Sequence, residues 1–244
     1  MYLTKRLKIL KLLQVMMQLL FLFKYQKKNK KKNKNLMKKL KKNLLMKRRT
    51  IPHKMKEVNK IKTFVGLGNF DFKYNHTKHN AGYWVVDELS KRLSEKFQTS
   101  KQSYVYAINK KYNIVLIKPT TGMNLSGIAV KQVCNKWQIS PSNVYVILDD
   151  IDLPLGSIRI KPKGGDGCHK GLESVLNHMG TKKIPRIRFG IAASDKIRPS
   201  EQYVLKPFRK KDQTLVNKMI FQTADAIQYL IDNDIQKTMN RFNQ

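Results

Sequence analysis

Cysteine is scarce in this chain, and the histidines form no pattern that would replace it. Only Cys134 and Cys168 occur in 244 residues, and the five histidines form no HxxxH or HExxH arrangement. A disulfide scaffold needs several cysteines, and a structural zinc site needs cysteines or histidines at short spacings. We therefore expect a protein that works in the reduced state, and we predict no metal and no other cofactor.

Acidic residues are also scarce. The chain has 16 Asp or Glu against 50 Lys or Arg, which gives a formal net charge of +34. The excess is uneven, because residues 1–60 hold 21 basic residues and a single acid, whereas residues 61–244 hold 29 basic and 15 acidic residues. Both parts are expected to attract polyanions such as nucleic acids.

No apolar run is long enough to span a bilayer. The longest, residues 12–23, has twelve residues and includes two glutamines, whereas a transmembrane helix needs about 20. This run follows a basic start, as the core of a signal sequence does. Residues 24–60 are rich in Lys and Asn without apolar periodicity, and we expect them to be disordered.

These features divide the chain into a leader, residues 1–60, and one folded domain, residues 61–244. The leader resembles the bipartite leader of proteins sent to a secondary plastid, with a mitochondrial presequence as the second possibility. A Lys/Asn-rich extension without a targeting role, on a cytoplasmic protein, is the third. The domain has the length of one sizeable core, and we expect no membrane segment in it.

The domain alternates strand-like and helix-like segments. Short apolar runs and a hairpin pattern predict strands at residues 63–67, 104–109, 113–117, 144–148, 157–161 and 186–192. Helical spacing predicts helices that begin near residues 81, 125 and 172, and two closing helices at residues 212–231 and 235–242. This alternation indicates an α/β domain.

Polar side chains follow two of the predicted strands. Asn69 comes after the first strand and the next loop carries Tyr74 and His79, while Asp149 directly follows the strand at residues 144–148. In open α/β sheets, ligands bind at the carboxyl ends of the strands. A carboxylate bonded to one imidazole nitrogen leaves the other nitrogen able to take a proton, which is what general-base catalysis requires.

A glycine-rich loop surrounds His169, with glycines at positions 164, 165, 167 and 171. This density predicts a mobile loop that closes over a site. The loop lacks the GK[ST] ending of a triphosphate-binding loop, and no serine lies in a GxSxG elbow. A covalent route through Cys168 is expected only if Cys168 adjoins His79.

Four segments, in order, resemble the signature motifs of bacterial-type peptidyl-tRNA hydrolase. They read FVGLGNFDFKYNHTKHNAG (64–82), PTTGMNLSG (119–127), LDDIDLPLG (148–156) and GGDGCHKGL (164–172). The resemblance covers nearly all of residues 62–244 and implies a single domain with a twisted mixed sheet flanked by helices on both faces. It also implies an enzyme that hydrolyses the ester joining a peptide to the 3′-terminal ribose of tRNA, and we expect a monomer.

The resemblance also implies roles for particular residues. His79 would be the general base and Asp149 the carboxylate that orients it. Contacts with the peptide part of peptidyl-tRNA would fall to Asn69, Tyr74, Met123, Asn124 and Lys170. Contacts with phosphates of the tRNA acceptor stem would fall to Lys161, Arg188 and Lys206.

The sequence departs from the family pattern at three places. Phe70-Asp71 replaces Pro-Gly, Gly122 replaces a bulky residue, and Lys170 stands where the family has an asparagine that binds substrate and positions water. The same fold also serves as a plastid RNA-splicing factor without hydrolase activity, so a non-catalytic RNA-binding protein is the alternative. Because a binder has no need for a base and its orienting acid, His79 and Asp149 favour the enzyme.

Overall fold

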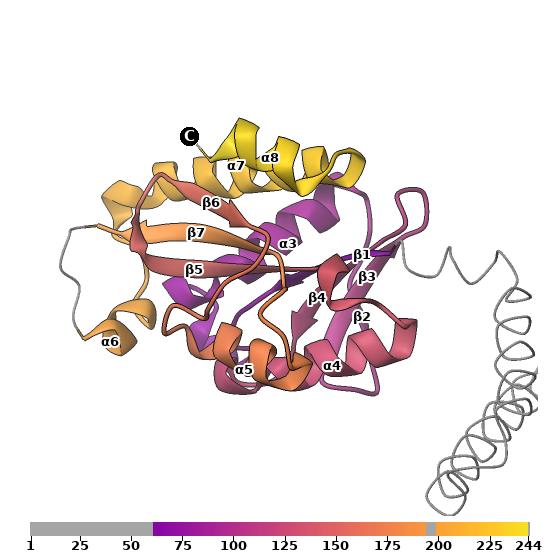
Figure 1. The fold of residues 1–244 in the computed structure, drawn as a ribbon. Coiled ribbons are helices and arrows are strands. Elements are labelled where there is room, and N and C mark those ends of the chain that lie inside the picture. Colours follow the sequence, from indigo (N-terminus) through magenta and orange to yellow (C-terminus); the bar gives the residue numbers. More distant parts are fainter. Residues whose placement is uncertain (1–60, 194–198, 244) are drawn as a thin grey trace, which may run out of the picture. The chain divides into compact units, whose positions relative to one another are not determined.

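The computed structural model describes residues 61–193 and 199–243. The predicted leader, residues 1–60, and its targeting role lie outside the described residues. The described chain forms a seven-stranded sheet with helices on both faces (Figure 1). The predicted α/β architecture, with a mixed sheet flanked by helices on both faces, is confirmed.

The sheet has the strand order β2-β3-β4-β1-β5-β7-β6. Its central pairs, β4 with β1, β1 with β5, and β5 with β7, are parallel, whereas β2, β3 and β6 join antiparallel. The strands are β1 (Lys62–Gly66), β2 (Gln98–Thr99), β3 (Tyr104–Asn109), β4 (Ile114–Pro119), β5 (Val144–Pro154), β6 (Ile158–Lys161) and β7 (Arg186–Ala192).

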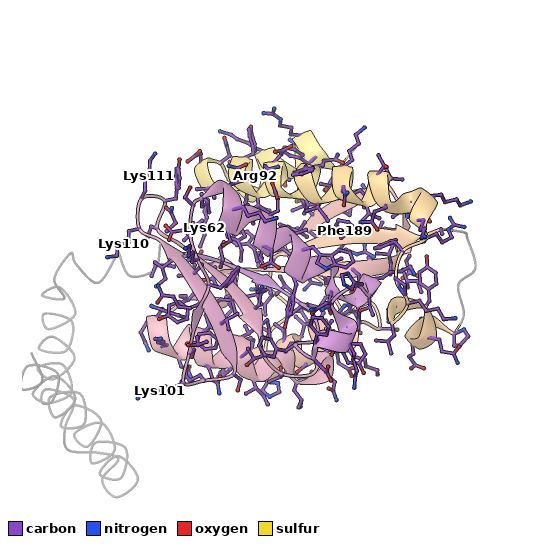
Figure 2. All side chains as sticks on the ribbon, turned by 180° about the vertical axis from the view of Figure 1, so that it is seen from behind. Lys62, Arg92, Lys101, Lys110, Lys111 and Phe189 are labelled. Carbon is purple, nitrogen blue, oxygen red and sulfur yellow. The ribbon has the colours of Figure 1, made fainter. Side chains whose placement is uncertain are left out.

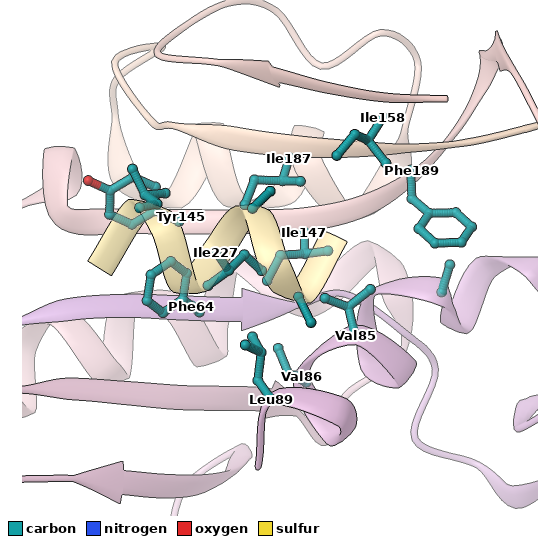
Figure 3. Close-up of a cluster of buried hydrophobic side chains, with 14 of the residues drawn as sticks. Phe64, Val85, Val86, Leu89, Tyr145, Ile147, Ile158, Ile187, Phe189 and Ile227 are labelled. Carbon is teal, nitrogen blue, oxygen red and sulfur yellow. The ribbon is translucent and has the colours of Figure 1, made fainter. Parts of the chain in front are cut away.

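Two apolar clusters cover the two faces of the sheet. Phe64 belongs to one cluster and its neighbour Val65 to the other, because successive side chains of a strand point to opposite faces. The cluster around Phe64 packs against α3 and α7, and Figure 3 shows Val85, Leu89 and Ile227 meeting it there. The helices are α3 (Ala81–Arg92), α4 (Ser126–Trp137), α5 (Lys170–Met179), α6 (Ser200–Val204), α7 (Gln213–Asp232) and α8 (Ile235–Phe242).

The start of α3 lies directly against β1, and this contact places the polar loop before α3. A Cβ added at Gly66 would lie 2.2 Å from the carbonyl oxygen of Gly82, so a side chain at position 66 would push strand and helix apart. The loop between them, which carries Asn69 and His79, is therefore held at the carboxyl end of β1. Since β5 is the parallel neighbour of β1, Asp149 reaches the same edge.

The structure differs from the prediction at four elements. β5 continues to Pro154 with a register shift after Asp150, six residues beyond the predicted end, because its outer part pairs with β7. α5 begins at Lys170, two residues early, because a side chain caps it. β2 and α6 were not predicted, since two and five residues give no readable periodicity.

Basic side chains cover much of the described surface. Lys101, Lys110 and Lys111 project from loops at the β2-β3-β4 side of the sheet, as Figure 2 shows. Phe189, in contrast, is fully buried. None of the helices in the described part of the chain combines the length and hydrophobicity that crossing a bilayer requires.

Candidate active site

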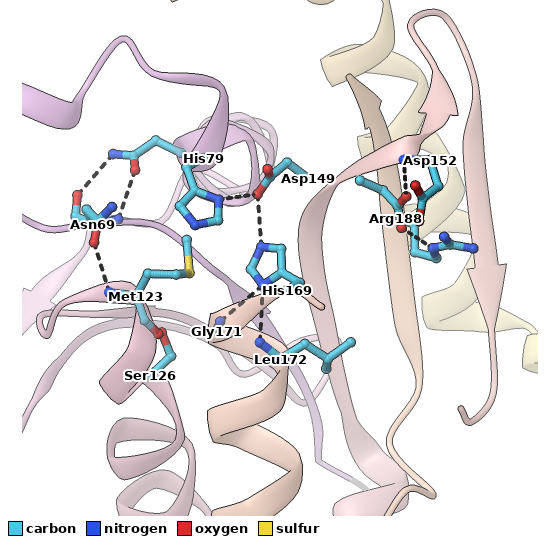
Figure 4. Close-up of polar contacts among 12 residues, drawn as sticks. Asn69, His79, Met123, Ser126, Asp149, Asp152, His169, Gly171, Leu172 and Arg188 are labelled. Carbon is cyan, nitrogen blue, oxygen red and sulfur yellow. Dashed lines mark hydrogen bonds and ion pairs between the residues drawn. The ribbon is translucent and has the colours of Figure 1, made fainter. Parts of the chain in front are cut away.

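Three side chains from separate segments meet at the carboxyl end of the central strands (Figure 4). Nδ1 of His79 lies 2.9 Å from Oδ1 of Asp149, and Nε2 of His169 lies 3.0 Å from the same oxygen. The Asp149 side chain is only 2% exposed. The structure thus brings the predicted pair His79 and Asp149 together and adds a second histidine to it.

The tautomer of His169 follows from its other ring nitrogen. Nδ1 accepts hydrogen bonds from the backbone N–H groups of Gly171 (3.1 Å) and Leu172 (3.2 Å), so that His169 is the N-cap of α5. A nitrogen that accepts carries no proton, and Nε2 therefore carries the proton and donates it to Asp149. His169 was not among the predicted site residues, although its position just before a helix was a signal for a cap.

Asp149 is a buried carboxylate held by these two donors. Burial alone would raise the pKa of Asp149, but its interactions with the imidazoles of His79 and His169, including the two hydrogen bonds that it accepts, hold it well below its usual range. Asp149 is therefore ionised at neutral pH and accepts a hydrogen bond from Nδ1–H of His79. The unprotonated nitrogen of His79 is then Nε2, the one able to accept a proton.

Asn69 and Asn80 fix the loop around His79. The backbone N–H of Asn69 donates to Oδ1 of Asn80 at 2.8 Å, and Nδ2 of Asn80 donates to the carbonyl of Asn69 at 3.0 Å. Oδ1 of Asn69 accepts from the backbone N–H of Met123 at 2.8 Å. Because its oxygen is engaged, the Asn69 side chain can offer Nδ2 as a donor to a substrate carbonyl.

A pocket of about 340 Å³ opens beside the two histidines, a size in the usual range for ligand pockets, roughly 300–1,000 Å³. Its walls come from His79, from residues 149–152 of β5, from residues 167–170 of the glycine loop and α5, and from Ser200, Glu201 and Val204 of α6. The glycine loop thus borders the site as predicted, while its motion stays a prediction. The contribution of α6 was not predicted.

Cys168 and His79 both line this pocket, whereas a thiol route requires that the two residues adjoin. Among the described residues, however, no hydrogen bond joins the Cys168 thiol to a histidine. The backbone N–H of Cys168 donates to Oδ1 of Asp166 at 2.8 Å, and its φ of 60° fixes a tight turn. Both residues line the pocket, but the geometry does not pair the thiol with a base.

Three other predicted peptide-binding residues, Met123, Asn124 and Tyr74, are not part of the pocket lining. Met123 is buried against α5, where a Cβ added at Gly171 would lie 2.4 Å from the Met123 sulfur. Asn124 is exposed in a turn and does not cap α4, whose N-cap is Leu125. Tyr74 is half-buried in the turn before His79 and does not line the pocket.

Lys170 lines the pocket at the first residue of α5. Its side chain is 62% exposed, and Nζ lies 3.4 Å from Oε2 of Glu173. This is a long, solvent-screened ion pair of the kind that contributes little to stability. The ammonium is therefore not locked beside the histidines.

The predicted phosphate contacts fall into two groups. Lys161 and Lys206 are exposed, so their ammonium groups can reach a polyanion. Arg188 instead forms an ion pair through its Nε with Asp150, a residue of β5 that lines the pocket (Figure 4). The ion pair with Asp150 already orients the Arg188 guanidinium, and a phosphate would bind to the guanidinium in addition to Asp150.

Arg186, two residues before Arg188 in β7, is 2% exposed. Its Nη1 donates to the carbonyl of Gly165 at 2.6 Å, and its Nε to the carbonyl of Ile184 at 3.0 Å. Burial lowers the pKa of Arg186, a cost that these hydrogen bonds offset. Arg186 therefore fastens the glycine loop to β7.

His79, Asp149 and His169 are also residue types that bind divalent metals, and their donor atoms lie within 4.8 Å of one another. In the observed arrangement one nitrogen of each imidazole points at a single carboxylate oxygen. A metal ion at this place would have to displace two hydrogen bonds. The arrangement suits proton transfer better than it suits coordination.

Comparison with known proteins gives a single result. The sequence model of the family described as peptidyl-tRNA hydrolase matches residues 63–244. A peptidyl-tRNA hydrolase of Sulfurihydrogenibium sp. (strain YO3AOP1) is 37% identical over 186 residues, which cover 75% of this chain and 98% of that protein. One from Hydrogenobaculum sp. (strain Y04AAS1) is 40% identical over 183 residues, with 75% and 97% covered.

Solved structures agree with these sequence relatives. The crystal structure of peptidyl-tRNA hydrolase from Acinetobacter baumannii superposes with a TM-score of 0.71 at 28% identity, covering 76% of this chain and 95% of that one. A peptidyl-tRNA hydrolase in complex with N-propanol gives the same TM-score, 0.71, at 28% identity. Sequence, fold and the grouping of His79 with Asp149 lead to one conclusion: the chain belongs to the peptidyl-tRNA hydrolase family.

Proposed function

We propose that this chain hydrolyses the ester bond between a peptide and the 3′-terminal ribose of tRNA, releasing free tRNA and the peptide. The observation that carries this proposal is the hydrogen bond of 2.9 Å between His79 and Asp149 at the edge of a 340 Å³ pocket. Membership of the peptidyl-tRNA hydrolase family supports the same activity.

His79 acts as the general base. Its Nε2 takes a proton from a water molecule while the water oxygen attacks the ester carbonyl carbon. Asp149 stabilises the imidazolium that results. The tetrahedral intermediate then breaks its bond to the ribose oxygen, which receives the proton from His79. No covalent enzyme intermediate is needed, because the ribose oxygen is a fair leaving group.

Asn69 binds the peptide part of the substrate through its Nδ2 donor. Its orientation is fixed on one side by Asn80 and on the other by the backbone N–H of Met123. Asn124 is exposed on the same turn as Met123, where it can add a second amide contact. An amide aimed at the developing oxyanion contributes to the rate in such reactions.

The acceptor stem of tRNA is held by basic side chains outside the pocket. Lys161 and Lys206 are exposed, and Arg188, whose side chain is 20% exposed, forms an ion pair with Asp150. The domain acts as a monomer, since one chain carries every group of the mechanism. Phosphate contacts of this kind depend strongly on salt concentration.

The leader, residues 1–60, directs the protein to an organelle, more in keeping with a plastid than with a mitochondrion. Its basic composition and its signal-like start at residues 12–23 support this proposal. A fluorescent protein fused after residue 60 should be found in an organelle. A diffuse cytoplasmic signal would contradict the proposal.

The activity is tested by release of free tRNA from N-blocked aminoacyl-tRNA. The full chain should release tRNA, and His79→Ala should lower the rate by about 10²- to 10⁴-fold while tRNA binding remains. A variant that keeps more than about a tenth of the rate would remove His79 as the base. RNA binding without any hydrolysis would support the non-catalytic alternative, which neither the family nor the intact His79–Asp149 pair favours.

A further inference from the structure

The residue before the proposed base is a buried lysine with unusual surroundings. Lys78 is 5% exposed, although lysine is almost never fully buried without a charged partner. Its Nζ donates to the carbonyls of Pro207 (2.9 Å), Lys206 (3.2 Å) and Tyr203 (3.5 Å). The ammonium also lies 4.1 Å from the centre of the Tyr203 ring and 5.3 Å from that of Phe208.

No carboxylate within the described residues forms an ion pair with this ammonium. Burial lowers the pKa of Lys78, and the nearby charges of Lys206 and Arg209 act in the same direction, against a smaller opposing effect of Asp212. The buried charge is therefore compensated by main-chain carbonyls and by two aromatic rings, which attract a cation through their faces. These groups must keep their positions, because moving any of them would leave the buried ammonium less well compensated.

The acceptors belong to one short stretch of chain, the end of α6 and the residues after it. Two main-chain contacts run beside the side chain: the N–H of Lys78 donates to the carbonyl of Lys206 at 3.2 Å, and Thr77 forms a β-bridge with Pro207. The hydroxyl of Tyr203 donates to the carbonyl of Ile191 in β7 at 2.7 Å. The end of α6 is thus fastened to the sheet by Tyr203 and to the histidine loop by Lys78.

α6 forms one wall of the substrate pocket. Ser200, Glu201 and Val204 line the pocket together with His79, and the glycine loop with His169 forms another part of the lining. α6 has only five residues and buries none of them completely. A helix of this length is not stable by itself, so its position depends on the contacts at its ends.

We propose that Lys78 is a positioning residue, which holds α6 and residues 203–208 at a fixed distance from His79 and so sets the shape of the substrate pocket. Lys78 does not touch the reacting atoms. It acts on binding of the peptide and on the placement of Lys206 for the tRNA. The role in catalysis rests on the proposed function, whereas the fastening of α6 does not.

The test compares Lys78→Met with Lys62→Met in the full chain. Lys62 is a matched control, because its Nζ also donates to three carbonyls, those of Leu230, Ile231 and Asn233, at the end of α7 and outside the pocket lining. Lys78→Met should raise KM for peptidyl-tRNA by about tenfold with a smaller change in kcat, as expected for lost ground-state binding. Lys62→Met should lower the thermal midpoint without changing KM.

Two further measurements separate positioning from a general loss of structure. Hydrogen exchange of residues 200–208 should accelerate in Lys78→Met relative to the rest of the domain, and Lys78→Arg should restore part of the affinity because it keeps a cation with several donors. If Lys78→Met does not fold, Lys78→Gln and Lys78→Arg carry the same comparison.

Unchanged KM in the Lys78 variants, or an equal rise in Lys62→Met, would overturn the proposal. Unchanged exchange at residues 200–208 would overturn it as well. A wild-type chain without hydrolase activity would refute the proposed function, and the exchange measurement would then still decide whether Lys78 fastens α6.

Discussion

Nε2 of His169 donates a hydrogen bond of 3.0 Å to the Asp149 oxygen that also accepts from the proposed base. The other nitrogen of His169 is held by two backbone N–H groups at the start of α5. The position of the carboxylate is therefore set by a helix terminus through an intervening imidazole. This chain of contacts fixes both the place and the tautomer of the groups around the reacting water.

Replacing His169 should affect both catalysis and stability. His169→Ala removes the N-cap of α5, which should cost about 1 kcal/mol of unfolding free energy, and it leaves Asp149 with one donor. We expect kcat to fall because the carboxylate can rotate away from His79. His169→Asn can still cap the helix but is too short to bridge to Asp149, so it should recover stability without recovering kcat. Equal recovery of both would show that the histidine acts only as a cap.

Asp149→Asn should lower kcat strongly, by an amount up to about 10⁴-fold. An amide in this place favours the wrong tautomer of His79 and stabilises the imidazolium less well. tRNA affinity should stay unchanged, because the phosphates are held outside the pocket. Steady-state kinetics on peptidyl-tRNA, with filter binding of tRNA alone, gives both quantities. An unchanged kcat would remove Asp149 from the mechanism.

The stability that Asp149 contributes should decrease as the pH falls. Its pKa is lower in the folded chain than in the unfolded chain, where it is about 3.9. The ionised carboxylate thus stabilises the fold at every pH above that value, and this stability is lost as the pH falls further through the folded pKa. The unfolding free energies of the wild type and Asp149→Asn, measured with urea, should differ by less at pH 3 than at pH 5. A difference that grows between pH 5 and pH 3 would contradict this assignment.

The two cysteines should behave differently towards alkylation. Cys168 is exposed and lines the pocket, whereas Cys134 is buried and burial raises its pKa to about 11. Iodoacetamide at pH 7.5 should modify Cys168 and block hydrolysis by filling the pocket, while Cys134 stays unmodified in the folded chain. Cys168→Ala should keep nearly full activity and become resistant to the reagent. Loss of activity in Cys168→Ala itself would support covalent catalysis by the Cys168 thiol.

Lys161→Ala and Arg188→Ala should weaken tRNA binding but differ in stability. Each should reduce the slope of log K against log salt by up to about one unit, as for one lost phosphate contact. Lys161 is exposed and its loss should leave the thermal midpoint unchanged. Arg188→Ala leaves Asp150, 11% exposed, without its ion-pair partner and should lower the midpoint. Salt titrations that do not change in either variant would place the phosphate contacts elsewhere.

The sequence made the main elements and the His79–Asp149 pair predictable, and the limits of that prediction have physical causes. Strands such as β1 and β5 were recognisable because continuous apolar runs mark buried parallel strands. The role of His169 was missed, because its position just before a helix indicates only a cap, and nothing in the sequence shows that its other ring nitrogen meets Asp149, a residue 20 positions away. For the same reason Lys78 carried no signal, since its three acceptors are carbonyls some 125 to 129 residues away.

Lys170 stands where the family resemblance implies an asparagine. Of the departures from the family pattern, this one changes the chemistry of the site most. The ammonium lines the pocket, but it lies beside Glu173 with most of its surface in solvent. If it stayed near His79, a positive charge would disfavour the imidazolium that forms as the base takes its proton, while it would also stabilise the oxyanion. Since the long side chain is directed to Glu173, both effects should be weak, and what remains is the loss of an amide that positions water or peptide.

We therefore expect Lys170→Asn to raise kcat for peptidyl-tRNA. Glu173→Gln is the matched control, because it releases the Lys170 ammonium without removing it. If the ammonium is only a solvated charge, Glu173→Gln should leave kcat unchanged. If kcat falls in Lys170→Asn, the lysine takes part in catalysis, and Glu173→Gln should then alter kcat as well, because it frees the same ammonium to approach the oxyanion.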